Sequence, residues 1–209
     1  GQSSTGSILR WLRGLFEGDA DLKGGDGLSY AELDALAARV PVGCEGLVAL
    51  ETFQGSRTPT TDPLARGALL GLSLRHTKGH IWRAMMEGVC LGTKAAVRGL
   101  HSAGHAADRI TIAGGATKSP LWLQMHADAT GLEVVVNACS EAPLLGAACL
   151  AAVGAGHFSS VDDAVAAMVR PAKRIRPDPA RAAEYDKLFG IYEQVLPTAG
   201  EVLHQLAAS

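Results

Sequence analysis

The 209-residue sequence contains no run of about 18 apolar residues, which is the length that a helix needs to span a bilayer. It has only four cysteines, which are widely spaced and include no C-x-x-C pair. The first absence argues against a membrane protein, and the second argues against a disulfide framework. We therefore expect buried, reduced thiols in a cytoplasmic protein that has no membrane partner.

An excess of positive charge is also missing. The 19 Lys and Arg residues are outnumbered by 21 Asp and Glu residues, the net charge is −2, and the basic residues are scattered along the chain. A protein that binds DNA or RNA through phosphate contacts needs a basic face, so we expect no nucleic-acid partner. The hydrophobic share of 47% and the charged share of 19% are typical of a soluble globular chain.

The first residues, GQSSTGSILRWL, contain no initiator Met, no basic segment and no long apolar segment of the kind found in signal peptides. They predict a helix over 7–16, because their apolar residues recur at helical spacing. We expect no signal peptide and a chain that begins inside a longer protein.

Common catalytic motifs are absent as well. Lys118 and Ser119 follow Thr117 where a phosphate-binding loop of the form G-x-x-x-x-G-K-[ST] would need glycine, and neither G-x-G-x-x-G nor G-x-S-x-G occurs. His76 and His80 are four residues apart, but no carboxylate lies at metal-ligand spacing beside them. We therefore predict no metal site and interpret the histidines as surface or capping residues.

The remaining pattern alternates strands with helices. After 7–16, helices are predicted over 29–39, 77–103, 119–131, 141–156, 161–169 and 180–207, and strands over 46–50, 108–113 and 132–137. This order favours an α/β fold with a mixed, mainly parallel sheet that helices cover on both faces. We expect the Gly- and Ala-rich helix over 141–156 to sit close to the sheet, and Pro197 to kink or interrupt the last helix.

The longest predicted helix, 77–103, has two different faces. One face is rich in small and apolar residues, including Met85, Gly88 and Gly92, and is expected to be buried. The other face is expected to lie in solvent and carries Arg83, Glu87, Lys94, Arg98 and His101.

The stretch ITIAGGATKSPLW, residues 110–122, is the most informative local segment. Gly114 and Gly115 follow an apolar strand, Ser119 is suited to cap the next helix, and Pro120 suits the first turn of that helix. The helix start would face the carboxyl end of the strand, where open α/β sheets bind ligands. A bare strand-to-helix turn and a ligand-binding loop both remain open, and the local sequence slightly favours the bare turn.

Four segments in order resemble the FGGY family of carbohydrate kinases. The stretch GALLGLSLRHTKGHIWRAMMEG, 67–88, resembles the hallmark segment of the C-terminal domain, and the loop over 53–67 is similar to the one that precedes it. The stretches over 112–136 and 141–156 are similar to the family's next strand-helix-strand unit and the helix after it. The resemblance runs from Gly1 to about Phe158, and the opening GQSSTG looks more like that of ribulose kinases than that of glycerol kinases.

This resemblance implies an actin/Hsp70-type ATPase domain, which is ribonuclease H-like. Residues 1–209 would be the C-terminal nucleotide-binding domain of a two-domain sugar kinase whose N-terminal sugar-binding domain is absent from this chain. Such a kinase transfers a phosphoryl group from ATP to a hydroxyl of a pentulose or a related ketose or polyol. ATP lies in the cleft between the two domains, so the implied partners are the protein's own N-terminal domain, ATP or ADP, and the sugar.

The resemblance also implies which residues border the nucleotide. Two belong to the first helix and four to the GGATKS segment, with Arg10 at a position where glycerol kinases carry Gln and Ser119 where they carry Asn. The implied contacts with adenosine and phosphates are Gly6, Arg10, Gly114, Gly115, Ala116 and Ser119.

The catalytic groups implied by the resemblance are not in this chain. The family's base aspartate and its D-x-G-T phosphate turn would lie upstream of Gly1, so no catalytic residue is assigned here, and Mg²⁺ would be held mainly by groups outside the chain. We expect the isolated chain to be inactive and to expose a docking patch through which a homodimer could form. The alternatives are a non-catalytic nucleotide-binding module and an actin- or Hsp70-like ATPase domain.

Other residues have two interpretations each. Trp11 and Trp122 have apolar neighbours at helical spacing, so we favour core or rim positions over stacking on adenine. Lys118 is expected in solvent beside the helix cap and not at a phosphate. Three charged residues of the loop over 53–67 either line an interdomain cleft or tie the loop through Arg–Asp pairs: Arg57, Asp62 and Arg66.

Overall fold

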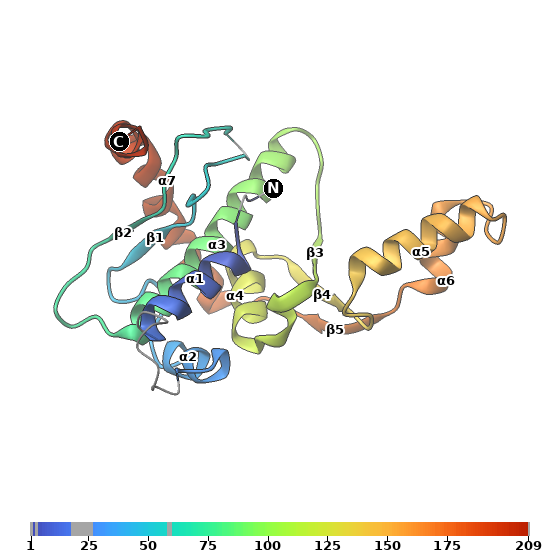
Figure 1. Cartoon of the computed structure of the whole chain (residues 1–209), viewed down its shortest axis with the longest axis horizontal. Coiled ribbons are helices and arrows are strands. Elements are labelled where there is room, and N and C mark those ends of the chain that lie inside the picture. Colours follow the sequence, from blue (N-terminus) through green and yellow to red (C-terminus); the bar gives the residue numbers. More distant parts are fainter. Residues whose placement is uncertain (1, 3, 18–26, 58–59, 209) are drawn as a thin grey trace.

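The computed structural model describes the chain except residues 1, 3, 18–26, 58–59 and 209. Within the described ranges, no helix is both long enough and apolar enough to cross a membrane. The elements, seen in Figure 1, are α1 (Gly6–Glu17), α2 (Tyr30–Ala37), β1 (Val48–Leu50), β2 (Ala68–Leu70), α3 (Lys78–Ser102), β3 (Arg109–Ile112), a 3₁₀ helix η1 (Gly114–Lys118), α4 (Pro120–Thr130), β4 (Glu133–Asn137), α5 (Ala142–Gly154), α6 (Val161–Met168), β5 (Pro171–Ile175) and α7 (Pro179–Ala207).

Helix α3 is the centre of the main core. It begins after Thr77, as predicted, and packs against α1, α2, α4, α7 and β1. Its small-residue face is confirmed as buried: a Cβ atom added to Gly88 would lie 2.7 Å from the carbonyl oxygen of Ala49 in β1. Glycine at this position therefore lets the helix and the strand approach each other closely.

The predicted solvent face of α3 is wrong at two residues. Arg83 and Glu87 are buried, because the segment before β1, which includes Gly43, and α7 cover this part of the helix and supply polar partners. Further along, Lys94 forms an ion pair with Asp186 of α7. Periodicity alone identified the polar stripe but could not show that α7 lies over it.

The strands form two small sheets. β1 and β2 are antiparallel, whereas β4 pairs in parallel with β3 on one side and antiparallel with β5 on the other. The β3–β4–β5 sheet is therefore mixed, as predicted. The expectation of mainly parallel pairing is wrong. The reason is that the α5–α6 hairpin turns the chain back before β5, which then runs opposite to β4.

One face of the β3–β4–β5 sheet is covered by α4. Leu123 and Ala127 of α4 form a small core with Val134 and Val136 of β4, against which Ile110 of β3 packs. On the other face of β3, Arg109 and Thr111 are exposed. The expectation that helices cover both faces is therefore wrong for this edge of the sheet.

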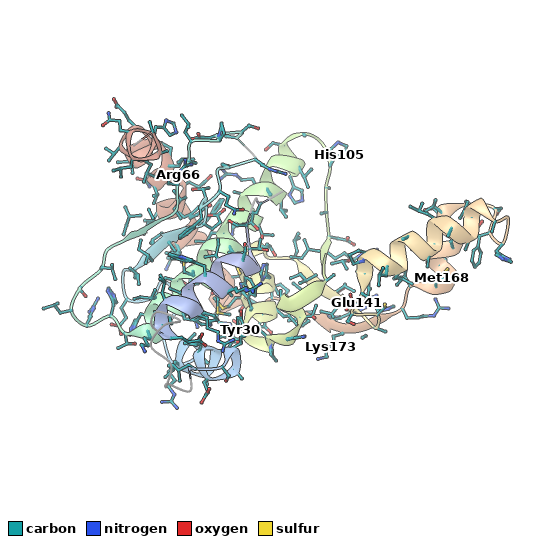
Figure 2. All side chains as sticks on the ribbon, viewed as in Figure 1. Tyr30, Arg66, His105, Glu141, Met168 and Lys173 are labelled. Atoms are coloured by element: carbon teal, nitrogen blue, oxygen red, sulfur yellow. The ribbon has the colours of Figure 1, made fainter. Side chains whose placement is uncertain are left out.

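Helix α5 is far from its expected position. It packs mainly on α6, and the two helices form a hairpin that projects from the body of the molecule (Figure 1). Its side chains reach outwards, with Leu144 68% and Leu150 61% exposed (Figure 2). Small residues permit a close approach to a sheet, but they do not enforce it when a neighbouring helix offers another contact.

One prediction about a helix start and one about a proline inside a helix have different outcomes. Ser29 and Glu32 form the predicted capping box: the Glu32 carboxylate accepts the Ser29 amide at 2.8 Å, and the Ser29 hydroxyl accepts the Glu32 amide at 3.3 Å. Pro197, in contrast, does not interrupt α7, which continues to Ala207. Proline removes one backbone hydrogen bond from a helix, and the loss of this one bond does not end α7.

Candidate functional site

A cavity of about 560 Å³ lies where α1, α2, α3, η1 and α4 meet. In Figure 1, α1 and α2 lie beside the beginning of α3, and α4 is their neighbour, while Figure 2 places Tyr30 at the same junction. Helix starts contribute much of the lining, and the rest comes from two tryptophans and one face of α2. The lining residues are Thr5, Gly6, Leu9, Tyr30, Ala31, Asp34, Trp82, Ala113, Gly115, Ala116, Lys118, Ser119 and Trp122.

Two glycines in this lining have no structural reason to be glycine. Neither Gly6 nor Gly115 has a positive φ, and a Cβ atom built on either would meet nothing within 4 Å. Gly114 is different, because its φ of 75° is a conformation that favours glycine, and it does not line the cavity. The missing side chains of Gly6 and Gly115 therefore leave open space at the cavity and serve no packing contact.

The segment after β3, for which the sequence left a bare turn and a ligand-binding loop open, forms a 3₁₀ helix. Gly114–Lys118 forms η1, and the Thr117 hydroxyl donates to the Gly114 carbonyl at 2.7 Å. Ser119 then caps α4 as predicted, with its hydroxyl accepting the Trp122 amide at 3.1 Å. The cavity therefore borders both η1 and the first turn of α4.

Aromatic side chains form the other part of the wall. The Trp82 indole donates to Asp34 Oδ1 at 2.8 Å, and the Trp122 indole donates to the Met86 carbonyl at 3.2 Å. The ring of Tyr30 lies 5.8 Å from that of Trp82. Because both indoles are anchored by hydrogen bonds, this wall is preformed.

The sequence also gave predictions for Trp11, Trp122 and Lys118, which can be compared with their positions in the structure. Trp122 is buried in the core, as predicted, but it also borders the cavity. Trp11 is half exposed and lies 5.2 Å from Phe53, outside the cavity lining. Lys118 is exposed, as predicted, and lies at the cavity edge.

The structure brings together four of the six residues that the resemblance assigned to the nucleotide. Gly6, Gly115, Ala116 and Ser119 line the cavity. Arg10 is exposed on α1 and, like Gly114, is not part of the lining. The assignment of a nucleotide to these residues remains a prediction.

Sequence reasoning missed the contribution of α2 and α3. Ala31 and Asp34 are three residues apart on α2, so they share the helix face that meets Trp82. The Ser29 capping box fixed where α2 begins, but no local signal showed which face would meet η1. These contacts depend on packing between segments that are far apart in the sequence.

In the described part of the loop over 53–67, none of the Arg–Asp pairs that were one of its two interpretations is formed. Among the described residues, Asp62 pairs with His204 of α7 at 2.7 Å and accepts the amides of Leu64 and Ala65. Arg66 donates to the Pro63 carbonyl at 3.2 Å. The loop is therefore tied to α7 and to its own backbone.

The histidines considered as metal ligands have capping contacts. His80 Nδ1 accepts the Thr77 amide at 3.2 Å, and His76 Nδ1 accepts the Ser73 amide at 2.9 Å. In the described ranges, no group of three or more His, Cys, Asp or Glu side chains is placed to hold a metal ion.

The chain is similar to known sugar kinases in sequence and in structure. Residues 1–155 match the model of the FGGY family of carbohydrate kinases, C-terminal domain. The xylulose kinase of Staphylococcus epidermidis is 31% identical over 92% of the chain, and the ribulokinase of Bacillus licheniformis is 31% identical over 96%. The chain spans 37% and 38% of the lengths of these two relatives.

The crystal structure of xylulose kinase from Rhodospirillum rubrum has a TM-score of 0.80 with this chain and 39% sequence identity. The match covers 97% of this chain and 39% of the longer one. The predicted fold class, that of FGGY sugar kinases, is thereby confirmed. Because the family model matches well over half of its residues, this chain belongs to the FGGY family of carbohydrate kinases.

Proposed function

We propose that this chain is the C-terminal, nucleotide-binding part of an ATP-dependent sugar kinase, and that its cavity holds the adenosine part of ATP. The observation that carries the proposal is the pair Gly6 and Gly115. They come from two different helix starts, they face one cavity, and a side chain on either would have free space. Close approach of a ligand to the backbone explains why both positions lack a side chain.

The rest of the lining suits the same ligand. A cavity of about 560 Å³ is within the range of small-molecule sites and is closed on one side by anchored aromatic rings. The helix starts at Gly6 and Ser119 provide backbone amides, which favour negative charge, and Lys118 adds a cation at the edge. One helix end contributes only about 0.3 to 1 kcal/mol to anion binding, so the phosphates need further contacts.

Those further contacts belong to the remainder of a longer kinase. In phosphoryl transfer, Mg²⁺ neutralises the phosphates and a base orients the attacking hydroxyl. By analogy with the family, we assign the base, most of the sugar site and most of the Mg²⁺ ligands to an N-terminal domain of the whole kinase. ATP and Mg²⁺ are the proposed cofactors, and a pentulose such as xylulose or ribulose is the proposed substrate, by analogy with the named relatives.

A substitution pair on α1 and η1 tests the nucleotide site. Gly6→Leu and Gly115→Leu should each weaken ATP binding by about tenfold or more, because the new side chain fills the space proposed for the ligand. Gly14→Leu is the matched control: Gly14 is also in α1 with nothing within 4 Å of its Cβ position, but it does not line the cavity. Affinity is measured by titration calorimetry, and equal effects at all three positions would exclude the cavity as the site.

Activity is tested separately. The chain alone should phosphorylate no sugar, whereas the whole kinase should use ATP with one member of a panel of pentuloses, hexuloses and polyols. Phosphorylation by the chain alone would contradict the assignment of the base and the sugar site to an N-terminal domain. Sugar-independent ATP hydrolysis by the whole protein would instead favour an ATPase.

A further inference from the structure

The side chain of Gln2 anchors the segment before α1 to the central helix α3. Its Nε2 atom donates hydrogen bonds to the Val89 carbonyl at 2.8 Å and to Glu51 Oε1 at 3.3 Å, and its Oε1 atom accepts the Thr93 hydroxyl at 3.2 Å. Val89 and Thr93 belong to α3, and Glu51 follows β1 directly. One carboxamide therefore joins the segment before α1 to two elements of the main core.

Helix α3 has a space that this carboxamide fills. A Cβ atom added to Gly92 would collide with Gln2 Nε2 and with Glu51 Oε1. Gly92 and Thr93 lie three and four residues after Val89, so the three residues border one face of the helix. Glycine at position 92 therefore allows two polar side chains from segments far apart in the sequence to lie directly on α3.

The carboxyl group of Glu51 needs such partners. Its side chain is only 6% exposed, and in the described part of the chain no cation pairs with it. Its other oxygen accepts the Tyr192 hydroxyl of α7 at 2.6 Å. Burial of an acid is costly unless hydrogen bonds satisfy it, so Gln2 and Tyr192 together make this position tolerable. The result is a buried polar network that links the segment before α1 with β1, α3 and α7.

The anchored segment leads directly into the wall of the cavity. Thr5 and Gly6 follow three and four residues after Gln2, and both line the cavity. The Thr5 carbonyl accepts the Ile8 amide at 3.1 Å, so the first turn of α1 begins at this point. Ser4 is nearer to the helix and buried, but among the described residues its hydroxyl has no hydrogen-bond partner. Gln2 therefore supplies the directional contact at this end of α1.

We infer that Gln2 is a positioning residue of the nucleotide site, whose carboxamide fixes where α1 begins and so holds the Gly6 backbone at the cavity wall. The inference rests on the proposed nucleotide site and adds a residue outside the cavity lining. Apolar packing of Ile8 and Leu12 holds α1 on the core, but this attraction is non-directional. Hydrogen bonds to two elements define the position of the helix start more narrowly.

Gln2→Met tests this role, because methionine has nearly the same length but cannot make the three hydrogen bonds. We expect ATP to bind the folded variant about three- to tenfold more weakly in titration calorimetry. Gln194→Met is the matched control: Gln194 is exposed, donates to the Gly190 carbonyl within α7, and lies outside the cavity lining. This control should leave the ATP affinity unchanged.

Thr93→Val tests the same contact from the other side, because it removes the hydroxyl that donates to Gln2. Alone it should weaken ATP binding less than Gln2→Met does. Added to Gln2→Met it should cause no further loss, because both changes act through one carboxamide. Losses that add in the double variant would overturn the inference.

Amide hydrogen exchange reports the helix start without any nucleotide. In Gln2→Met the Ile8 amide should exchange faster, whereas the Leu123 amide, which donates to the Ser119 carbonyl at the start of α4, should not change. A residue that served stability alone would lower the free energy of unfolding and leave the ATP affinity of the folded chain unchanged. That result would overturn the role of Gln2 and leave the nucleotide site intact, whereas a wild-type chain that binds no ATP would overturn both.

Discussion

Helices α3 and α5 both contain small residues but have opposite surroundings. α3 also carries charged side chains and is buried along its first half, whereas α5 carries none and has only Cys149 buried. The difference lies in what other segments supply. Five elements pack around α3, while α5 has α6 as its main neighbour and projects with it from the body (Figure 1).

A cluster of buried polar groups lies at α3, the well-packed helix of the two. Glu87 pairs with Arg83 at 2.8 Å, accepts the Tyr185 hydroxyl at 3.2 Å, and accepts the Gly43 amide at 3.1 Å. These partners come from α3, α7 and the segment before β1. Charged residues can be buried here because three segments satisfy their hydrogen bonds together.

The largest effect is expected from breaking this cluster. Arg83→Met removes the cation and leaves the Glu87 carboxylate buried without its charge partner, so the free energy of unfolding should fall by about 3 to 5 kcal/mol. Arg98→Met is the control, because Arg98 is exposed where it pairs with Glu193 and should cost at most about 1 kcal/mol. Urea denaturation measures both. Similar losses would mean that burial of the Arg83 pair adds nothing.

A matched glycine pair gives the next largest effect, with opposite signs in the two helices. Gly88→Ala places a Cβ atom 2.7 Å from the Ala49 carbonyl oxygen and should destabilise the chain by about 1 to 3 kcal/mol. Gly146→Ala in α5 meets nothing within 4 Å and should stabilise by about 0.5 to 1 kcal/mol, through helix propensity.

Thermal and urea unfolding of the two alanine variants can be compared directly. A destabilising Gly146→Ala would show that α5 has a neighbour at this position, which would weaken the contrast between the helices.

A smaller effect concerns pH. Burial raises the pKa of Glu51, whose carboxyl accepts the Tyr192 hydroxyl at 2.6 Å, and no cation pairs with it among the described residues. The folded state therefore holds this proton more tightly than the unfolded state, so stability should fall as pH rises above the ordinary glutamate pKa. The slope is at most about 1.4 kcal/mol per pH unit.

Glu51→Gln should remove this dependence between pH 5 and 8, as measured by urea unfolding at each pH. Glu141→Gln, at the exposed start of α5, should leave it unchanged. A wild-type stability that rises relative to that of Glu51→Gln over the same interval would contradict the sign.

Local signals predicted much of the fold. The Ser29 capping box, the Thr77 helix start and the Ser119 cap before Pro120 all appear where the sequence placed them. Each depends on hydrogen bonds between residues a few positions apart, so the neighbouring sequence is sufficient. The small-residue face of α3 was also predictable, because helical periodicity aligns Gly88 and Gly92 on one side.

The site was predictable only in part. The resemblance to the family named Gly6, Gly115, Ala116 and Ser119, which line one cavity, but it gave no indication that Tyr30, Asp34 and Trp82 complete the wall. It also included Arg10 and Gly114, which lie outside that lining. The spacing of a motif can be read from the sequence, whereas the wall formed by Tyr30, Asp34 and Trp82 depends on how α2 and α3 pack.

The sequence by itself determined the family, the order of the α-helices and of β1, β3 and β4, and several helix caps, because these depend on motifs and short-range contacts, whereas β2 and β5 were not predicted. Tertiary structure alone decided that Arg83 and Glu87 are buried, that β5 returns antiparallel to β4, and that α5 leaves the sheet. In each case the deciding neighbour is distant in sequence. The sequence pattern indicates which face of an element can be buried, but only the tertiary structure determines which other element packs against that face.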